Sequence, residues 1–337
     1  MSKKNILLTG ASGTVGFEVL KQLLENKLYN VTVFDKESKI SVKKLSQFKN
    51  QIKIIYGDIS NPVDIQKIPH NQHAVIHLAA IIPPVADDFP ALAQRINVDG
   101  TQNLVQHLEQ TSPNCFFLYS SSISVYGDRV QNPLITVNDP LAPSPGDEYA
   151  LTKIQAEELL KSSHLDYTIF RLAAIMGGHK MSKLMFHQPL STSLEIATPR
   201  DTARAFVNGI EKQNQLSKRT FNLGGGEKCR TLYSDFLQQS FEIFGLGKLD
   251  FPEKAFAEKN FHCGFYADAE DLQNIVDFQR DSLKDYFEME AAKMSSLKKI
   301  GASIFKKPVK QYLLRQSEPL QALKDRNNQL INHYYNS

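Results

Sequence analysis

The stretch "LLTGASGTVGFEVLKQLL" (residues 7–24) decides the fold. A short apolar run leads into three glycines, Gly10, Gly13 and Gly16, and a helical periodicity of apolar residues follows them. Glycine permits a tight turn and lets the backbone approach a pyrophosphate, which the N–H groups of the following helix start then face. This GxxGxxG spacing between a strand and a helix therefore predicts a dinucleotide-binding turn.

The rest of the first half alternates apolar, β-branched runs with helical stretches. We expect strands at 5–9, 31–35, 52–56, 74–79, 115–120 and 167–172, and helices at 15–25, 90–110 and 147–162. This order is typical of an α/β protein with a Rossmann-type, doubly wound parallel sheet. We expect residues 1–173 to form the NAD(P)-binding domain, with 199–223 returning to it. Residues 174–198 and 224–292 should form a smaller C-terminal substrate-binding lobe.

Composition excludes several other classes. The 337 residues carry a net charge of +3 with mixed signs, so no nucleic-acid partner is expected. The three cysteines lie far apart, which argues against zinc and disulfides, and no metal site is expected. We find neither a signal peptide at the N-terminus nor an apolar run of about 18 residues. The expectation is a cytoplasmic protein.

Residues 293–337 differ from the rest and form a basic C-terminal extension. Seven cations and no acid lie between residues 293 and 315, and Leu297, Ile300, Ile304 and Phe305 could share one helical face. Two interpretations stay open. The segment is a solvated helix packed on the acidic stretch 268–290, or a basic amphipathic stretch that makes weak contact with an anionic membrane surface.

Two acids at strand ends point to the adenosine half of the cofactor. Asp35 lies 19 residues after Gly16, where a carboxylate accepts hydrogen bonds from ribose hydroxyls and repels a 2′-phosphate. NAD is therefore expected, and NADP stays open because Lys36 follows. The alternative role for Asp35 is a loop cap. Asp58 and Ile59 end the third strand, where they could contact the adenine ring.

A hydroxyl-rich loop and a helix point to the reacting end. "YSSSISVYG" (119–127) follows the fifth strand, and "EYALTK" (148–153) places Tyr149 and Lys153 on one helical face. An ammonium beside a phenol favours the phenolate, so we expect Lys153 to lower the pKa of Tyr149. Tyr149 would move a proton while a hydride moves at the nicotinamide.

These motifs together resemble the extended short-chain dehydrogenase/reductase family, also called NAD-dependent epimerase/dehydratases. The resemblance runs from residue 4 to about 290 and includes "TGASGTVG", "HLAA" (77–80), "NVDGTQNL" (97–104), "SSSISVYG", "YALTK" and "FRLAAIMGG" (170–178). It implies Ser122, Tyr149 and Lys153 as the catalytic set, a small-molecule substrate, and a homodimer through helices at about 90–110 and 147–162. The residues expected to bind the cofactor are Gly10, Ser12, Gly13, Thr14, Val15, Gly16, Asp35, Lys36, Asp58, Ile59, Leu78, Ala79, Ala80, Asn97, Ser120, Tyr149, Lys153, Leu172 and Ala174.

The chain differs from this family at the positions that act on or bind sugar nucleotides. The acids used by dehydratases are replaced by Ile123 and Ser124, and Ala174 stands where epimerases usually carry an asparagine. Leu194 or Glu195 occupies the usual position of a diphosphate-binding arginine, which leaves Arg200 and Arg204 as alternative cations. A mostly apolar or moderately polar substrate is expected. Its pocket candidates are 81–89, Tyr126, Met176, His179, Met185 and Phe186, with His187 as a further substrate-ligand candidate.

Three functions follow from this pattern. The leading one is an NAD(P)-dependent oxidoreductase that acts on a carbonyl or a secondary alcohol. The second is an NAD-dependent sugar-nucleotide epimerase, in which the hydride is removed and returned. The third is a non-catalytic dinucleotide-binding sensor or assembly protein, although relatives of that kind commonly lose the tyrosine or the lysine, which are both present here.

Overall fold

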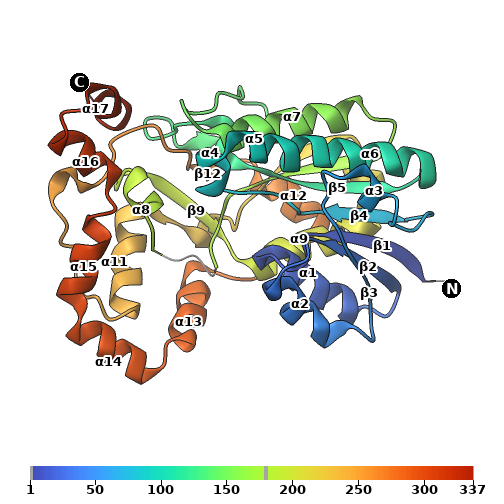
Figure 1. The fold of residues 1–337 in the computed structure, drawn as a ribbon, viewed down its shortest axis with the longest axis horizontal. Helices are drawn as coiled ribbons and strands as arrows, with labels where there is room; N and C mark the ends of the chain where they lie inside the picture. The colour runs from blue at the N-terminus through green and yellow to red at the C-terminus, as the bar shows by residue number, and fades with distance from the viewer. Residues whose placement is uncertain (1–2, 178–180, 337) are drawn as a thin grey trace.

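A seven-stranded parallel sheet forms the centre of the molecule (Figure 1). The computed structural model describes residues 3–177 and 181–336. Strand order is β10-β7-β5-β4-β1-β2-β3, and every neighbouring pair is parallel. The strands are β1 (Lys4–Thr9), β2 (Tyr29–Asp35), β3 (Lys53–Tyr56), β4 (Ala74–His77), β5 (Phe116–Ser122), β7 (Asp166–Leu172) and β10 (Arg219–Leu223). The predicted doubly wound sheet is confirmed, with β10 as a seventh strand.

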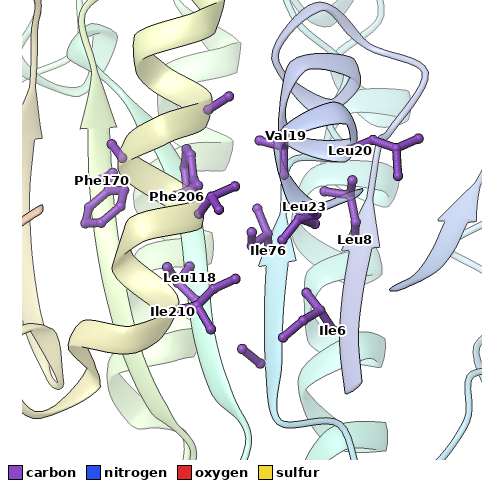
Figure 2. Close-up of a cluster of buried hydrophobic side chains, with 14 of the residues drawn as sticks. Ile6, Leu8, Val19, Leu20, Leu23, Ile76, Leu118, Phe170, Phe206 and Ile210 are labelled. Carbon is purple, nitrogen blue, oxygen red and sulfur yellow. The ribbon is translucent and has the colours of Figure 1, made fainter. Parts of the chain in front are cut away.

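Helices cover both faces of this sheet. On one face, α1 (Thr14–Glu25) and α9 (Pro199–Gly209) pack on strands β1, β4, β5 and β7, with Val19, Leu23 and Phe206 among the buried contacts (Figure 2). On the other face lie α3 (Pro62–Ile65), α6 (Gly100–Thr111) and α7 (Glu148–Ser162). Because both faces are buried, the strands read as continuous apolar runs in the sequence.

The chain reverses its winding direction between β1 and β4, which are neighbours in the sheet although β2 and β3 lie between them in the sequence. Connections leave the carboxyl ends of these strands in opposite directions, so a crevice opens there. The glycine turn after β1 and the loop after β4 line this crevice, and the hydroxyl loop after β5 lies beside it. The topology therefore brings the predicted site segments to one edge of the sheet.

A smaller lobe stands beyond that edge. Its sheet, β11-β9-β8, comprises β8 (Ala174–Ile175), β9 (Ser193–Ala197) and β11 (Arg230–Leu232), and a short pair joins β6 (Leu134–Ile135) to β12 (Phe265–Tyr266). Its aromatic core includes Phe186, Phe236 and Phe241. The segment 199–223 supplies α9 and β10 to the main sheet. The division into two domains with these boundaries remains our proposal.

The described residues form further α-helices. They are α2 (Lys39–Leu45), α4 (Val85–Asp88), α5 (Pro90–Ala93), α8 (Leu184–His187), α10 (Gln213–Leu216), α11 (Tyr233–Ile243), α12 (Ala269–Val276), α13 (Leu283–Lys293), α14 (Ser296–Ile304), α15 (Lys306–Leu314), α16 (Glu318–Lys324) and α17 (Asn328–Tyr334). The predicted helix at 90–110 is interrupted by a wider π-helical turn, Gln94–Asp99, between α5 and α6. The expected loop 176–189 contains α8.

Two searches of the described residues gave negative results. No helix within residues 3–177 and 181–336 is long and apolar enough to cross a membrane. In the same part of the chain, no three side chains of histidine, cysteine, aspartate or glutamate gather as a metal site would require. The three cysteines are free and buried.

Candidate active site

The glycine turn is shaped for close approach by a ligand. Gly10 adopts a φ of +72°, and a Cβ there would lie 2.8 Å from the Ala79 nitrogen. A Cβ on Gly16 would lie 2.1 Å from the Gly10 carbonyl oxygen, so no side chain fits either position. Helix α1 starts at Thr14 with no side-chain cap, which leaves its first N–H groups available to an anion. This cradle fits a dinucleotide pyrophosphate.

One cavity of about 240 Å³ lies on the β2 side of the turn. Ten residues predicted to bind the cofactor line it: Gly10, Ser12, Gly13, Asp35, Lys36, Asp58, Ile59, Leu78, Ala79 and Ala80. Phe34, Gly57, Ile81 and Ile96 complete its wall. The position, between the ends of β2 and β3 and the glycine turn, matches the expected adenosine half of the site.

Asp35 is held in place by the glycine turn itself. Its carboxylate accepts hydrogen bonds from the Ser12 backbone nitrogen at 2.7 Å and from the Ser12 hydroxyl at 3.0 Å. Burial raises the pKa of Asp35, and these bonds and the Lys44 ammonium oppose the rise. Lys44 in turn donates to the Ser12 carbonyl oxygen at 2.8 Å. The backbone nitrogen of Lys36 is a third donor, so the carboxylate retains a lone pair that can accept from a ribose hydroxyl.

Asp58 is fixed in a similar way by its own turn. Its carboxylate accepts from the Ser60 nitrogen at 2.9 Å and from the Ser60 hydroxyl at 2.7 Å. Partial burial raises its pKa, but the two bonds from Ser60 and the charges of Lys36 and Arg95 lower it, and the net shift is downward. Asp58 is therefore an ionised acceptor at neutral pH, as an adenine amino group requires.

A second cavity, of about 310 Å³, lies on the other side of the turn. It brings together Gly10, Gly13, Thr14, Val15, Gly16, Leu78, Ala80, Ser120, Ser122, Tyr149, Lys153 and Leu172, all of which are predicted site residues. Ile82, Ser121, Ala173 and Ile175 complete the lining. The three residues of the expected catalytic set thus share one cavity with the glycine turn.

Lys153 is buried beneath this cavity. Its ammonium donates to the Ser120 carbonyl oxygen at 2.8 Å and lies 5.6 Å from the centre of the Tyr149 ring. Burial lowers the pKa of Lys153 to about 7, against the opposing charge of Glu157. The amino group therefore loses part of its charge near neutral pH.

Tyr149 has a raised pKa, whereas we expected a lowered one. Burial is the main cause, the Asp147 carboxylate adds to it, a hydrogen bond with Ser122 opposes it, and Asp87 adds a further rise. Asp87 accepts from the Tyr149 backbone nitrogen at 3.2 Å, and Asp147 accepts from the Ala150 nitrogen at 2.8 Å as the cap of α7. The two acids that position the helix thus also disfavour the phenolate.

Two predicted cofactor contacts lie outside both cavities. The Asn97 side chain bonds the backbone nitrogen and oxygen of Ile81, at 2.7 and 2.9 Å, and the Thr152 hydroxyl, at 3.0 Å. It thereby ties the loop after β4 to α7. Ala174 belongs to β8 and packs on the core of the smaller lobe, while its neighbours Ala173 and Ile175 line the cavity. These positions adjoin the site rather than line it.

Sequence reasoning missed two groups that support the site. His77 is buried, with Nδ1 2.7 Å from the Thr9 hydroxyl and Nε2 3.0 Å from the Thr101 hydroxyl. Its pKa falls to about 3 because of burial and the nearby Lys153. Glu157 is the second, and it binds Arg171 through two hydrogen bonds of 3.0 and 2.7 Å. The sequence could have predicted that Glu157 lies near Lys153, since it follows Lys153 by four residues on the same helical face.

Several pocket candidates are committed to packing instead. Met185 and Phe186 are buried in the core of the smaller lobe. The Tyr126 hydroxyl donates to Asn222 and accepts from Arg171, so it is not free to meet a substrate. The expectations for Met185 and Phe186 were wrong because the loop 176–189 folds α8 into the lobe, and the expectation for Tyr126 was wrong because Asn222 and Arg171 hold its hydroxyl. His179 lies outside the described residues.

The cations considered for a diphosphate are also engaged. Arg200 forms an ion pair with Asp281, and Arg204 pairs with Asp201 and donates to the Phe278 carbonyl oxygen. His187 lies 2.8 Å from Glu318. None of these groups lines either cavity.

Comparison with known proteins agrees with this geometry. The family model described as "NAD dependent epimerase/dehydratase family" matches residues 6–191. The chain is 25% identical to D-erythronate dehydrogenase of Cupriavidus necator, over 66% of this chain and 77% of that protein. It is 26% identical to 3 beta-hydroxysteroid dehydrogenase type 7 of Mus musculus, over 71% of each chain.

Solved structures show the same fold. UDP-glucuronic acid 4-epimerase from Bacillus cereus, solved with UDP-glucuronic acid and NAD, superposes with a TM-score of 0.69 at 22% identity. The match covers 86% of this chain and 98% of that one. Because the family match spans more than half of the sequence, this chain belongs to the NAD dependent epimerase/dehydratase family, a family of NAD-dependent dehydrogenases and epimerases.

Proposed function

We propose that this chain binds NAD and catalyses net oxidation–reduction between a carbonyl compound and a secondary alcohol. The observation that carries the proposal is the convergence of Ser122, Tyr149 and Lys153 in one cavity with the glycine turn. Bound NAD would supply the hydride chemistry. Both curated relatives named above are dehydrogenases, which supports net redox chemistry.

The roles of the three residues follow from their surroundings. The Tyr149 hydroxyl, hydrogen-bonded to Ser122, faces the place where a substrate oxygen would be held. Lys153 keeps further N–H donors besides the one used by Ser120, and these can hold a ribose hydroxyl. Tyr149 donates a proton when a carbonyl is reduced and accepts one when an alcohol is oxidised. Its raised pKa favours the donating role at neutral pH.

The adenosine half of the site supports NAD as the preferred cofactor. The Asp35 carboxylate lies in the cavity wall, where it would repel a 2′-phosphate. Lys36 also lines that wall and would partly offset the repulsion. We propose that the predicted cofactor-binding residues that line the two cavities bind NAD. Asn97 and Ala174 would lie next to these residues.

A sugar-nucleotide epimerase is less well supported by the side chains. Diphosphate recognition needs charge-assisted donors, and Arg200 and Arg204 are both paired with buried aspartates. Leu194 lies in the core of the smaller lobe, and Glu195 is a buried acid paired with Arg230. The apolar residues that line the same cavity as Tyr149, namely Ile82, Leu172 and Ile175, favour a substrate of limited polarity.

The test is a comparison of two tyrosine variants. Wild type should bind NADH and should oxidise a member of a panel of secondary alcohols when NAD is supplied. Tyr149→Phe should abolish this turnover, while its affinity for NADH should stay close to that of wild type. Tyr312→Phe, at an exposed tyrosine, serves as the matched control. Turnover retained in Tyr149→Phe would refute the proton role. Turnover without a net change in the absorbance of reduced nicotinamide would assign the chain to the epimerases.

A further inference from the structure

Helix α14 turns its apolar side away from the protein. Leu297, Ile300 and Ile304 lie on one face, with 83%, 57% and 70% of their surface exposed, and Phe305 follows with 60%. The opposite side of the helix contacts the smaller lobe, because Ala302 packs on its core. A surface helix of a globular protein normally buries its apolar face, so this orientation needs a partner.

The segment that carries this apolar face is rich in cations. Lys293, Lys298, Lys299, Lys306, Lys307, Lys310 and Arg315 lie in residues 293–315, and no acid stands among them. Lys293 pairs with Glu290, and Lys310 pairs with Asp250. Within residues 3–177 and 181–336, the other five cations form no ion pair. We call residues 293–315 the α14–α15 corner, which stands at an outer end of the molecule, well away from the main sheet (Figure 1).

We propose that the α14–α15 corner docks on the surface of an anionic lipid bilayer. Leu297, Ile300 and Ile304 would enter the boundary between head groups and acyl chains, while lysines of the same corner meet the lipid phosphates. An anionic bilayer surface complements both features of the corner, its outward apolar face and its uncompensated positive charge. Among the described residues, Lys293 is the one cation of the corner that pairs with an acid of the stretch 268–290, namely Glu290, so packing on that stretch neutralises little of the corner's charge.

A second copy of the chain fits this surface poorly. A symmetric dimer through the corner would place the five cations without an ion pair opposite the same five cations of the second copy, around an apolar centre. Like charges at an interface disfavour association, so the dimer would lose what the apolar contact contributes. A bilayer that contains anionic lipid supplies the opposite charge and an apolar layer at once.

Vesicle sedimentation of the full chain tests the proposal. The probes are phosphatidylcholine vesicles with and without phosphatidylserine, at low and high salt. Wild type should bind the anionic vesicles, and bind neutral ones or anionic ones in high salt at least about tenfold more weakly. The triple variant Leu297→Ser/Ile300→Ser/Ile304→Ser should lose binding by a similar factor, and so should Lys298→Gln/Lys299→Gln/Lys306→Gln/Lys307→Gln.

Matched controls use equally exposed side chains elsewhere. They are Leu28→Ser/Ile40→Ser/Val63→Ser for the apolar set and Lys27→Gln/Lys39→Gln/Lys43→Gln/Lys49→Gln for the charges. All variants should keep the wild-type melting temperature and NADH affinity, because every substituted side chain is exposed. Binding that is independent of phosphatidylserine, or lost equally in the controls, would overturn the proposal. A concentration-dependent dimer abolished by the apolar triple variant, without vesicle binding by wild type, would assign the corner to a second copy.

Discussion

Replacing Glu157 with leucine should destabilise the protein strongly although Glu157 lies outside both cavities. The fully buried carboxylate accepts from Arg171 through Nε and Nη2 and from the Ser121 hydroxyl at 2.6 Å. It thereby joins α7, which carries Tyr149 and Lys153, to β5 and β7. Within the described residues, the variant leaves the buried Arg171 guanidinium with two hydrogen-bond partners, the Tyr126 hydroxyl and the Val137 carbonyl oxygen.

The expected loss follows from that unpaired charge. Removing one partner of a buried ion pair costs about 3–5 kcal/mol, because the other charge stays desolvated. Glu158 provides a matched control on the same helix, since its side chain is exposed and pairs with Lys161. Glu158→Leu should cost less than about 1 kcal/mol. The double variant Glu157→Leu/Arg171→Leu should be more stable than Glu157→Leu alone, because it buries no charge there.

Urea unfolding monitored by circular dichroism measures these differences, and pH supplies an independent check. Burial raises the pKa of Glu157, but the hydrogen bonds and charge of Arg171, the bond from Ser121 and the charge of Lys161 lower it, and the net shift is downward. The pair therefore contributes stability above the unfolded pKa, about 4.3, and this contribution is lost as pH falls through the folded value. If Glu157→Leu were no less stable than Glu158→Leu at neutral pH, the assignment of a buried supporting pair would be wrong.

Three further outcomes are expected. Gly16→Ala should abolish NADH binding measured by fluorescence, because its Cβ would lie 2.1 Å from the Gly10 oxygen, whereas Gly301→Ala, in open space, should not; equal affinities would contradict the cradle. Asp35→Ala should raise the affinity for NADPH relative to NADH. A wild type that already prefers NADPH would show that the Asp35 carboxylate does not select NADH over NADPH. Lys153→Met should abolish turnover. The same variant should raise the free energy of unfolding at pH 6 by a few kcal/mol, because a lysine pKa lowered to about 7 means that the folded protein destabilises the charged form by about that much. This gain should shrink as pH rises above 7, because the folded protein then no longer buries a charged lysine; a gain that grows with pH would exclude the reasoning.

The sequence predicted those parts of the site that are formed by residues close together in the chain. The glycine turn, Asp35, Asp58 and the Tyr149–Lys153 pair each depend on residues close together in the chain, and the structure brings them to the same edge of the sheet. The pKa of Tyr149 was not predictable in this way. The lysine beside it suggested a lowered value, but burial and the acids at the start of α7, Asp147 and Asp87, raise it.

What the sequence determined by itself was the winding of the sheet and the chemistry at its edge, because strand periodicity, glycine spacing and an i,i+4 pair are local properties. Only the tertiary structure decided which charges are buried together and which surfaces stay uncovered. Glu157 meets Arg171 because α7 packs on β7, and Arg200 is neutralised by Asp281, 81 residues away. The apolar face of α14 points outward because Ala302 docks on the smaller lobe. Such outcomes depend on packing between distant segments, which no local pattern encodes.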